Sequence, residues 1–137
     1  IKGSCLCKKI SFEIKNECRY SVFCHCQMCQ ASNAEFSSYT KVKKENLNFK
    51  SKKTLKWFVS SKYYKRGFCS ICGSSLFFQK RSSDNYISIS TGSLNKYIPS
   101  IGHIFYKYKK SNINFSKLKK FPQSAQGYFD KFIYRIK

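Results

Sequence analysis

Seven of the eight cysteines of this chain fall into three short clusters, and their spacing constrains the fold more than any other feature. Cys-x-Cys and Cys-x-x-Cys spacings hold two sulfurs on one tight turn, which suits shared metal coordination better than disulfides between distant segments. A redox pair of the thioredoxin kind needs a strand-to-helix setting, which the sequence does not clearly provide. The clusters therefore predict a small zinc protein of a reducing compartment. They are Cys5-x-Cys7, Cys24-x-Cys26-x-x-Cys29 and Cys69-x-x-Cys72.

The clusters can be divided between two zinc ions. A structural zinc takes four ligands in a closed tetrahedron, and two close pairs brought together by folding supply four thiolates. Cys24, Cys26 and Cys29 then hold a second zinc whose fourth position is open, as in catalytic zinc sites. Spacing alone does not force this division, because Cys24 and Cys26 could instead join either outer pair. The set expected for the structural ion is Cys5, Cys7, Cys69 and Cys72.

Three further residues bear on the metal sites. Cys18 could be a fourth ligand of the trio, which would close the second site, but the simpler expectation is a free, partly buried cysteine. His25 lies between two expected ligands, so its side chain is expected to point away from the metal. It is expected to contact the ligands or to lie on the surface rather than to bind the metal itself. His103 lies in an alternating segment and is expected to be a structural residue.

Size and composition favour one folded domain spanning residues 1–137, because 42% hydrophobic content is too apolar for disorder. The net charge of +21 raises nucleic acid or another polyanion as a partner. Bidentate phosphate recognition favours arginine, however, and only four basic residues are arginine, so most of the charge is interpreted as solvated surface. No segment has the length of a membrane span or the apolar centre of a signal peptide, and a cytoplasmic protein is expected.

Hydrophobic periodicity predicts an antiparallel all-β fold. Polar and apolar residues alternate, and β-branched and aromatic residues gather, in short segments separated by polar turns. A short turn or helical stub is expected after Cys29, and a hairpin is expected around Cys69 to Cys72, with Gly73 at positive φ. Weaker signals cover 115–121 and 127–136, the latter a candidate amphipathic helix. The expected strands are 10–14, a strand through Phe36 and Tyr39, 48–50, 54–61, the two arms of the hairpin, 86–94 and 101–110.

The chain contains, in this order, the motifs GSCLC, CHCQMC, FCSICGSSLFF, STGSL, GHIF and KKFP. Their order resembles the glutathione-dependent formaldehyde-activating enzyme family, which includes the domain of centromere protein V, and the resemblance covers about Gly3 to Pro122. It implies a β-tent fold, a structural zinc and a second zinc on the two cysteine sets given above. It also implies a carbon-sulfur lyase that joins glutathione, its cosubstrate, and formaldehyde into S-hydroxymethylglutathione.

The chain departs from the family pattern at a few positions. Lys8 stands where the family usually has glycine, Gln30 where a basic residue often follows the trio, and Phe115 near a frequent tryptophan. Arg66 matches a common family arginine that could hold a glutathione carboxylate, or it is an ordinary solvent-facing or strand-pairing arginine. Two other functions stay open: a zinc-stabilised binding module for nucleic acid or another polyanion, and a non-catalytic glutathione carrier.

Overall fold

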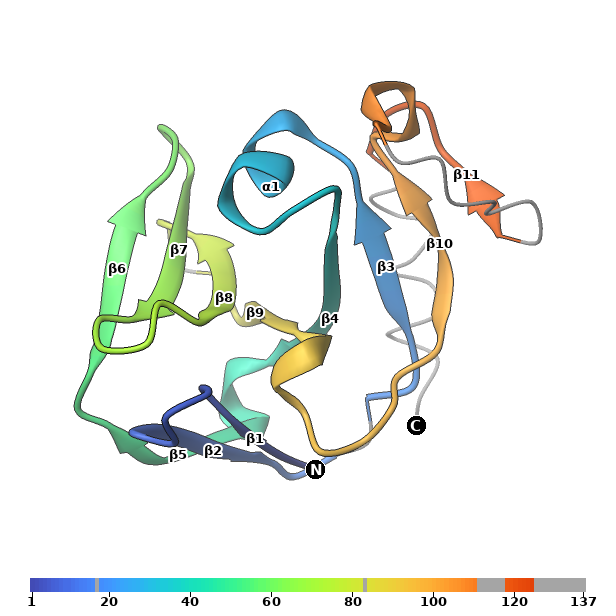
Figure 1. Ribbon diagram of the computed structural model, residues 1–137. Coiled ribbons are helices and arrows are strands. Elements are labelled where there is room, and N and C mark those ends of the chain that lie inside the picture. The colour runs from blue at the N-terminus through green and yellow to red at the C-terminus, as the bar shows by residue number, and fades with distance from the viewer. Residues whose placement is uncertain (17, 83, 111–117, 125–137) are drawn as a thin grey trace. The chain divides into compact units, whose positions relative to one another are not determined.

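The computed structural model describes residues 1–16, 18–82, 84–110 and 118–124. The chain divides into two compact units. The first comprises Ile1–Cys18 and Thr40–Tyr97, and the second comprises Arg19–Tyr39 and Ile98–Lys137. The weak signals at 115–117 and 127–136 lie outside the described residues. Strand dominates both units, which confirms the prediction of an all-β fold (Figure 1).

The first unit contains a three-stranded sheet with the order β1-β2-β5, paired antiparallel throughout. Its core side is set by the alternation of β2, in which Ile10, Phe12 and Ile14 are buried and the residues between them are half-exposed. The ring of Phe12 packs against Phe49 and Phe77 at centroid distances of 6.1 and 5.2 Å. The strands are β1 (Lys2–Ser4), β2 (Ile10–Ile14) and β5 (Leu47–Lys52).

The other strands of the first unit form an antiparallel series in the order β9-β8-β7-β6, and they lie side by side in Figure 1. The expected hairpin is present as β7 and β8, joined through the turn that carries Cys72. The expected strand 86–94 ends early, because Thr91–Ser93 form a 3-10 turn. The elements are β6 (Leu55–Val59), β7 (Tyr64–Cys69), β8 (Ser75–Lys80), β9 (Tyr86–Ser90), and the 3-10 turns η1 (Lys44–Asn46) and η2 (Thr91–Ser93).

Strand β4 (Ser37–Lys43) begins in the second unit and continues into the first. In the second unit it pairs antiparallel with β3, which pairs with β10, and β10 pairs with β11. Both pairings of β10 are parallel, so the expectation of a purely antiparallel fold was wrong for this strand. The elements are β3 (Ser21–Cys24), α1 (Gln27–Ser32), β10 (Ser100–Ile104), η3 (Tyr106–Tyr108) and β11 (Lys119–Lys120).

The expected strand 101–110 is also shorter than its alternating pattern indicated. Strand β10 ends at Ile104 because Phe105 adopts a left-handed backbone, with φ of 54°. A 3-10 turn over Tyr106–Tyr108 follows directly. The alternation of apolar and polar residues therefore continued through a turn, where it carries no information on strand pairing.

Candidate metal centres

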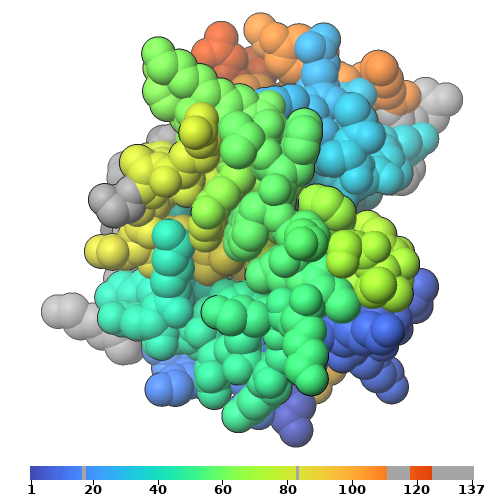
Figure 2. All heavy atoms as spheres, turned by 90° about the vertical axis from the view of Figure 1, so that its left-hand side faces the viewer, coloured from blue at the N-terminus to red at the C-terminus, as the bar shows by residue number. Residues whose placement is uncertain are grey.

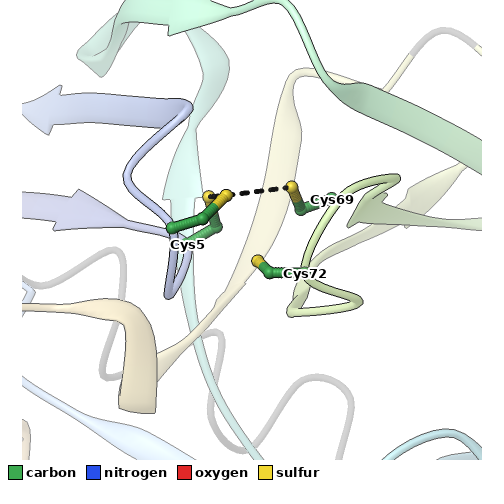
Figure 3. Close-up of side chains that lie close together, drawn as sticks. Cys5, Cys69 and Cys72 are labelled. Carbon is green, nitrogen blue, oxygen red and sulfur yellow. Dashed lines mark hydrogen bonds between the residues drawn. The ribbon is translucent and has the colours of Figure 1, made fainter.

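Four cysteines meet in the first unit. Cys5 and Cys7 lie in the turn between β1 and β2, Cys69 ends β7, and Cys72 lies in the following turn. The four sulfurs all lie within 4.8 Å of one another (Figure 3). In Figure 2 the yellow-green turn after β7 lies beside the blue N-terminal segment, which brings the two pairs together. The spacing predicted this grouping, and folding supplies it across more than sixty residues.

The sulfur separations suit a tetrahedral ion. Bonds of ~2.3 Å between zinc and sulfur require ~3.8 Å between two sulfurs of a regular tetrahedron. The Sγ atoms of Cys5 and Cys7 lie 3.5 Å apart, and those of Cys7 and Cys69 lie 3.8 Å apart. Four thiol donors at this spacing therefore fit a metal ion of zinc type in both chemistry and dimension.

Each turn of this cluster is closed by a backbone hydrogen bond to its first cysteine. The N–H of Lys8 donates to the carbonyl of Cys5 at 3.0 Å, and the N–H of Gly73 donates to the carbonyl of Cys69 at 2.9 Å. Lys8 and Gly73 have φ of 61° and 73°, so each turn passes through the left-handed region. That backbone conformation tightens the turn enough to bring the cysteines of each pair toward one point.

Hydrogen bonds from outside the cluster reach three of the sulfurs. The Cys5 sulfur accepts from the N–H of Ile10 at 3.3 Å, and the sulfurs of Cys69 and Cys72 lie 3.2 Å from the hydroxyls of Thr54 and Ser74. The Ser74 hydroxyl, with the N–H groups of Cys7 and Ser74, lowers the pKa of Cys72 to about 5. These donors favour the thiolate form, which is the form that binds metal.

The thiol of Cys7 behaves in the opposite way. The N–H of Lys9 acts to lower its pKa, but desolvation and the neighbouring thiols outweigh that effect and raise the pKa to about 11. One sulfur of the cluster thus ionises readily, and a second ionises only with difficulty beside it. A cation among the four sulfurs would offset the repulsion between neighbouring thiolates, because it interacts favourably with each of them.

Three cysteines meet in the second unit, all within one short stretch of chain. Cys24 ends β3, Cys26 caps the N-terminus of α1, and Cys29 lies in the helix. Their sulfurs also lie within 4.8 Å of one another. The Cys26 sulfur accepts from the N–H of Cys29 at 3.4 Å, as an N-cap does. Cys24 and Cys29 are buried, whereas Cys26 is partly exposed, so the trio has an accessible side at Cys26.

Crowding opposes ionisation of the trio. The thiols of Cys26 and Cys29, followed by burial, raise the pKa of Cys24. The pKa of Cys26 is also raised, since the effects of Cys29 and of burial outweigh the lowering effect of Cys24. A positive ion among the three sulfurs would offset this effect and favour their thiolate forms, which fits the chemistry of a metal site with three protein ligands.

A buried histidine pair adjoins the trio. The Nε2 atom of His25 and the Nδ1 atom of His103 lie 2.8 Å apart, and both residues are fully buried. The rings of Phe36 and Tyr106 pack against His25 at centroid distances of 5.6 and 5.7 Å. Burial, followed by His25 and nearby lysines, lowers the pKa of His103 to about 4, and burial lowers the pKa of His25. The pair is therefore neutral at pH 7 and is a buried structural contact rather than a surface feature.

The side chain of Gln30 links the residue between two of the trio's cysteines to the 3-10 turn η3. Its Nε2 atom donates to the carbonyl of His25 at 2.6 Å and to the carbonyl of Tyr108 at 2.7 Å. The sequence indicated only that Gln30 departs from the family pattern, because neither acceptor can be identified before the fold is known. The sequence also did not indicate that the hydroxyls of Thr54 and Ser74 contact the sulfurs of Cys69 and Cys72. The one signal for Ser74 is its position two residues after Cys72.

Two residues singled out in the sequence, Cys18 and Arg66, belong to the first unit, whereas the trio belongs to the second. Cys18 is buried in the first unit beside Thr40, its pKa is raised by burial, and among the described residues it joins neither sulfur group. Arg66 is 5% exposed in β7, and its guanidinium lies 4.9 Å from the centroid of the Phe78 ring. Its expected role in holding a carboxylate remains a prediction.

Within the described residues, no helix has the length and apolar character needed to cross a membrane. The fold and the sulfur groups define a small all-β protein with one four-cysteine and one three-cysteine group, each able to hold a metal ion. The chain belongs to the glutathione-dependent formaldehyde-activating enzyme family, whose family model matches residues 1–108.

Comparison with solved structures supports the fold. A crystal structure of a Rhodobacter sphaeroides protein, a structural genomics target, is similar with a TM-score of 0.60. The sequences are 19% identical, and the similarity covers 73% of this chain and 99% of that one. No curated protein matches the sequence.

Proposed function

We propose that this protein is a zinc-dependent enzyme of the carbon-sulfur lyase type that joins glutathione and a small aldehyde, as an S-hydroxymethylglutathione synthase does. The observation that carries the proposal is the group of three thiols, Cys24, Cys26 and Cys29, with its accessible side at Cys26. Family membership supports glutathione and formaldehyde as the substrates. We further propose a cytoplasmic location, because thiol metal sites persist where thiols are kept reduced.

The two sulfur groups would have different tasks. Four thiols complete the coordination of a tetrahedral ion, so a zinc in the first group would be structural. A zinc in the second group would have an open position and would supply Lewis acidity, which favours the thiolate form of a bound thiol. This division gives two zinc ions per chain. The first group consists of Cys5, Cys7, Cys69 and Cys72.

The surrounding residues would hold the trio in place during the reaction. Cys24 and Cys29 are buried and anchor it to the end of β3 and to α1, while Cys26 faces the accessible side. The neutral His25 and His103 pair fixes the position of the residue between two of the ligands without adding a charge. An uncharged, rigid support leaves the reactivity of the sulfurs to the metal and the substrate.

The reaction itself is balanced without an oxidant or reductant. The glutathione sulfur adds to the aldehyde carbon, so a carbon-sulfur bond forms and the π bond of the carbonyl breaks. The thiol proton passes to the carbonyl oxygen, which becomes a hydroxyl. The excess of positive charge, +21, would attract the anionic tripeptide.

The test compares the rate of adduct formation in the presence and in the absence of the purified protein. We expect Cys26→Ser to lower the protein-dependent rate at least 100-fold, because the substitution removes a thiolate ligand at the accessible side. Cys18→Ser is the matched control, since Cys18 joins neither sulfur group, and it should retain the rate within two-fold. Equal rates for wild type and Cys26→Ser would exclude catalysis at the trio.

A glutathione carrier without turnover is the closest alternative, and the same experiment separates the two. A carrier binds glutathione, and Cys26→Ser abolishes that binding, yet the wild-type protein does not raise the rate of adduct formation above the spontaneous rate. An enzyme raises the rate in proportion to its concentration. Isothermal titration with glutathione, run beside the rate assay, gives both quantities.

A polyanion-binding module is the second alternative, favoured by exposed aromatic residues and lysines on β6 and in the turn between β6 and β7. Phe58 and Tyr63 are 62% and 63% exposed, and the ammonium of Lys62 lies 5.4 Å from the centroid of the Tyr63 ring. Aromatic and cationic groups together suit nucleic acid. Steeply salt-dependent binding to duplex DNA would support this alternative, and weak binding indifferent to salt would exclude it.

A further inference from the structure

We propose that a cavity in the first unit binds a small organic dianion of the phosphate monoester class, independently of the chemistry at the trio. The cavity has a volume of about 940 Å³, within the range of small-molecule sites. Its walls come from β1, β2 and the turn between them, with contributions from Lys50, the turn after Cys72, and the η2 region. All of its lining residues belong to the first unit, whereas the trio belongs to the second.

The charge of the lining residues suits a dianion. Three lysines, Lys2, Lys8 and Lys50, line the cavity, and Glu13 is the one acid among the described lining residues. Glu13 already pairs with Lys50, since the carboxylate oxygen lies 3.3 Å from the ammonium. Among the described residues Lys2 and Lys8 have no carboxylate partner, so their two ammonium groups are available to the oxygens of a phosphate monoester, which carries close to two negative charges near pH 7.5.

The remaining lining provides both hydroxyl donors and apolar surface. Ser4 and Ser11 lie opposite each other on β1 and β2, and both line the cavity. Apolar surface comes from Leu6 and Leu94, whereas the ring of Phe12 lies behind the wall of the cavity and is only 2% exposed. Hydroxyls and ammonium groups together recognise phosphate oxygens, while the apolar residues accommodate the organic part of the ligand. The combination favours an organic phosphate over a free inorganic ion.

Lys8 allows a specific test of the proposed phosphate site, because its backbone is in the left-handed region, with φ of 61°. A residue with a side chain is strained in that conformation, and glycine would occupy it without strain. Lys8 is exposed, so no core packing offsets the strain. A lysine at such a position is explained if its charge serves a ligand. The competing explanation is that Lys8 only balances the charge of a metal bound by the adjoining Cys7.

The experiment titrates the full-length, metal-loaded protein with phenyl phosphate in an isothermal calorimeter at pH 7.5. We expect saturable binding that is at least five-fold tighter than binding of benzenesulfonate, which has the same apolar body but one charge. We also expect it to be tighter than binding of inorganic phosphate, which lacks the apolar body. No saturable binding of phenyl phosphate, or equal binding of all three compounds, would overturn the proposal.

Two variants then locate the site. Lys8→Gly should raise the melting temperature by ~3 °C, because it relieves strain, and should weaken phenyl phosphate binding about ten-fold. Lys2→Ala should weaken binding similarly without raising the melting temperature. Lys9→Ala is the matched control, since Lys9 is exposed but does not line the cavity, and should leave binding within two-fold. If Lys8→Gly leaves binding unchanged and lowers the retention of metal, Lys8 serves the metal and the proposal fails.

Discussion

Both cysteine groups are built from cysteines that are closely spaced in the sequence, yet they differ in how far they reach along the chain. In the first group the sulfurs of Cys7 and Cys69, 62 positions apart, lie 3.8 Å from each other. In the second group Cys24 and Cys29 mark the ends of one short stretch that closes on itself at the start of α1. A metal in the first group would tie two distant segments together, whereas a metal in the second would cross-link only its own turn.

The two groups also differ in the hydrogen bonds that reach their sulfurs. Outside donors reach the first group through Ile10, Thr54 and Ser74, which favours thiolates that hold a metal permanently. The second group has an N-cap hydrogen bond at Cys26 and an accessible side. The stability lost on removing a ligand should therefore depend on the length of chain that the metal site closes, and the reactivity of the bound metal should depend on the missing fourth sulfur.

The largest expected effect is the loss of stability on breaking the first group. Cys69→Ser removes a fully buried ligand that joins the two pairs, and we expect the free energy of unfolding to fall by at least ~5 kcal/mol. The purified variant should be largely unfolded by circular dichroism at 25 °C. A folded variant that melts within a few degrees of wild type would show that this group does not hold the fold together.

A smaller effect on stability is expected from the histidine pair beside the second group, and it depends on pH rather than on a metal ligand. The pKa of His103 is about 4 in the folded protein against 6.5 in an unfolded chain. Below pH 6.5 the unfolded chain binds a proton that the folded chain does not, so stability falls as the pH falls toward 4. The expected loss between pH 7.5 and pH 5 is about 2 kcal/mol.

The measurement is urea unfolding of wild type and His103→Gln at both pH values. Glutamine is neutral throughout, so the variant should lack this part of the pH dependence. Loss of metal at low pH affects both proteins, and the difference between them isolates the histidine. Identical pH dependence in the two proteins would contradict a neutral, buried His103.

A third prediction tests whether strand packing supports the first group. Gly3 lies in β1, and a Cβ atom there would stand 2.3 Å from the ring of Phe12, which is buried and has little room to move. Gly3→Ala should therefore cost about 2 kcal/mol. Gly92→Ala is the matched control, because no heavy atom lies within 4 Å of its Cβ position, and it should cost less than ~0.5 kcal/mol. Equal melting temperatures for Gly3→Ala and Gly92→Ala would show that β1 can shift to accommodate a Cβ atom at no cost in stability.

The smallest effect on stability is expected from the second group itself. Cys26→Ser alters a partly exposed residue whose metal site closes only a short stretch, and we expect a loss of at most ~1 kcal/mol. One zinc per chain should be lost. A loss of stability comparable with that of Cys69→Ser would remove the distinction between the two groups. Thermal melting combined with metal analysis of the same sample measures both effects.

The sequence was sufficient for the parts of the molecule that depend on local pattern. The alternation of Ile10, Phe12 and Ile14 predicted β2, and the knuckle around Cys69 to Cys72 predicted the β7 and β8 hairpin. The division of seven cysteines into four and three was also predicted, although spacing alone left other combinations open, and the sulfur groups in the structure have the same members.

Contacts made across long stretches of chain were beyond the sequence. The parallel pairing of β10 with β3 follows from the path of the whole chain, and nothing in the composition of β10 indicates it. His25 and His103 are 78 positions apart, so their hydrogen bond was invisible although each residue had been considered. Lys8 shows a third limit, since its left-handed backbone contradicts the preference of its side chain.

The release of zinc to a chromogenic chelator tests most directly whether one sulfur group is closed and the other open. Wild-type protein with its full zinc content is mixed with excess chelator at pH 7.5, while circular dichroism follows the fold. We predict two zinc ions per chain, one released rapidly with the fold intact and one released slowly as the protein unfolds. A single zinc per chain, or two ions released together on unfolding, would contradict the account.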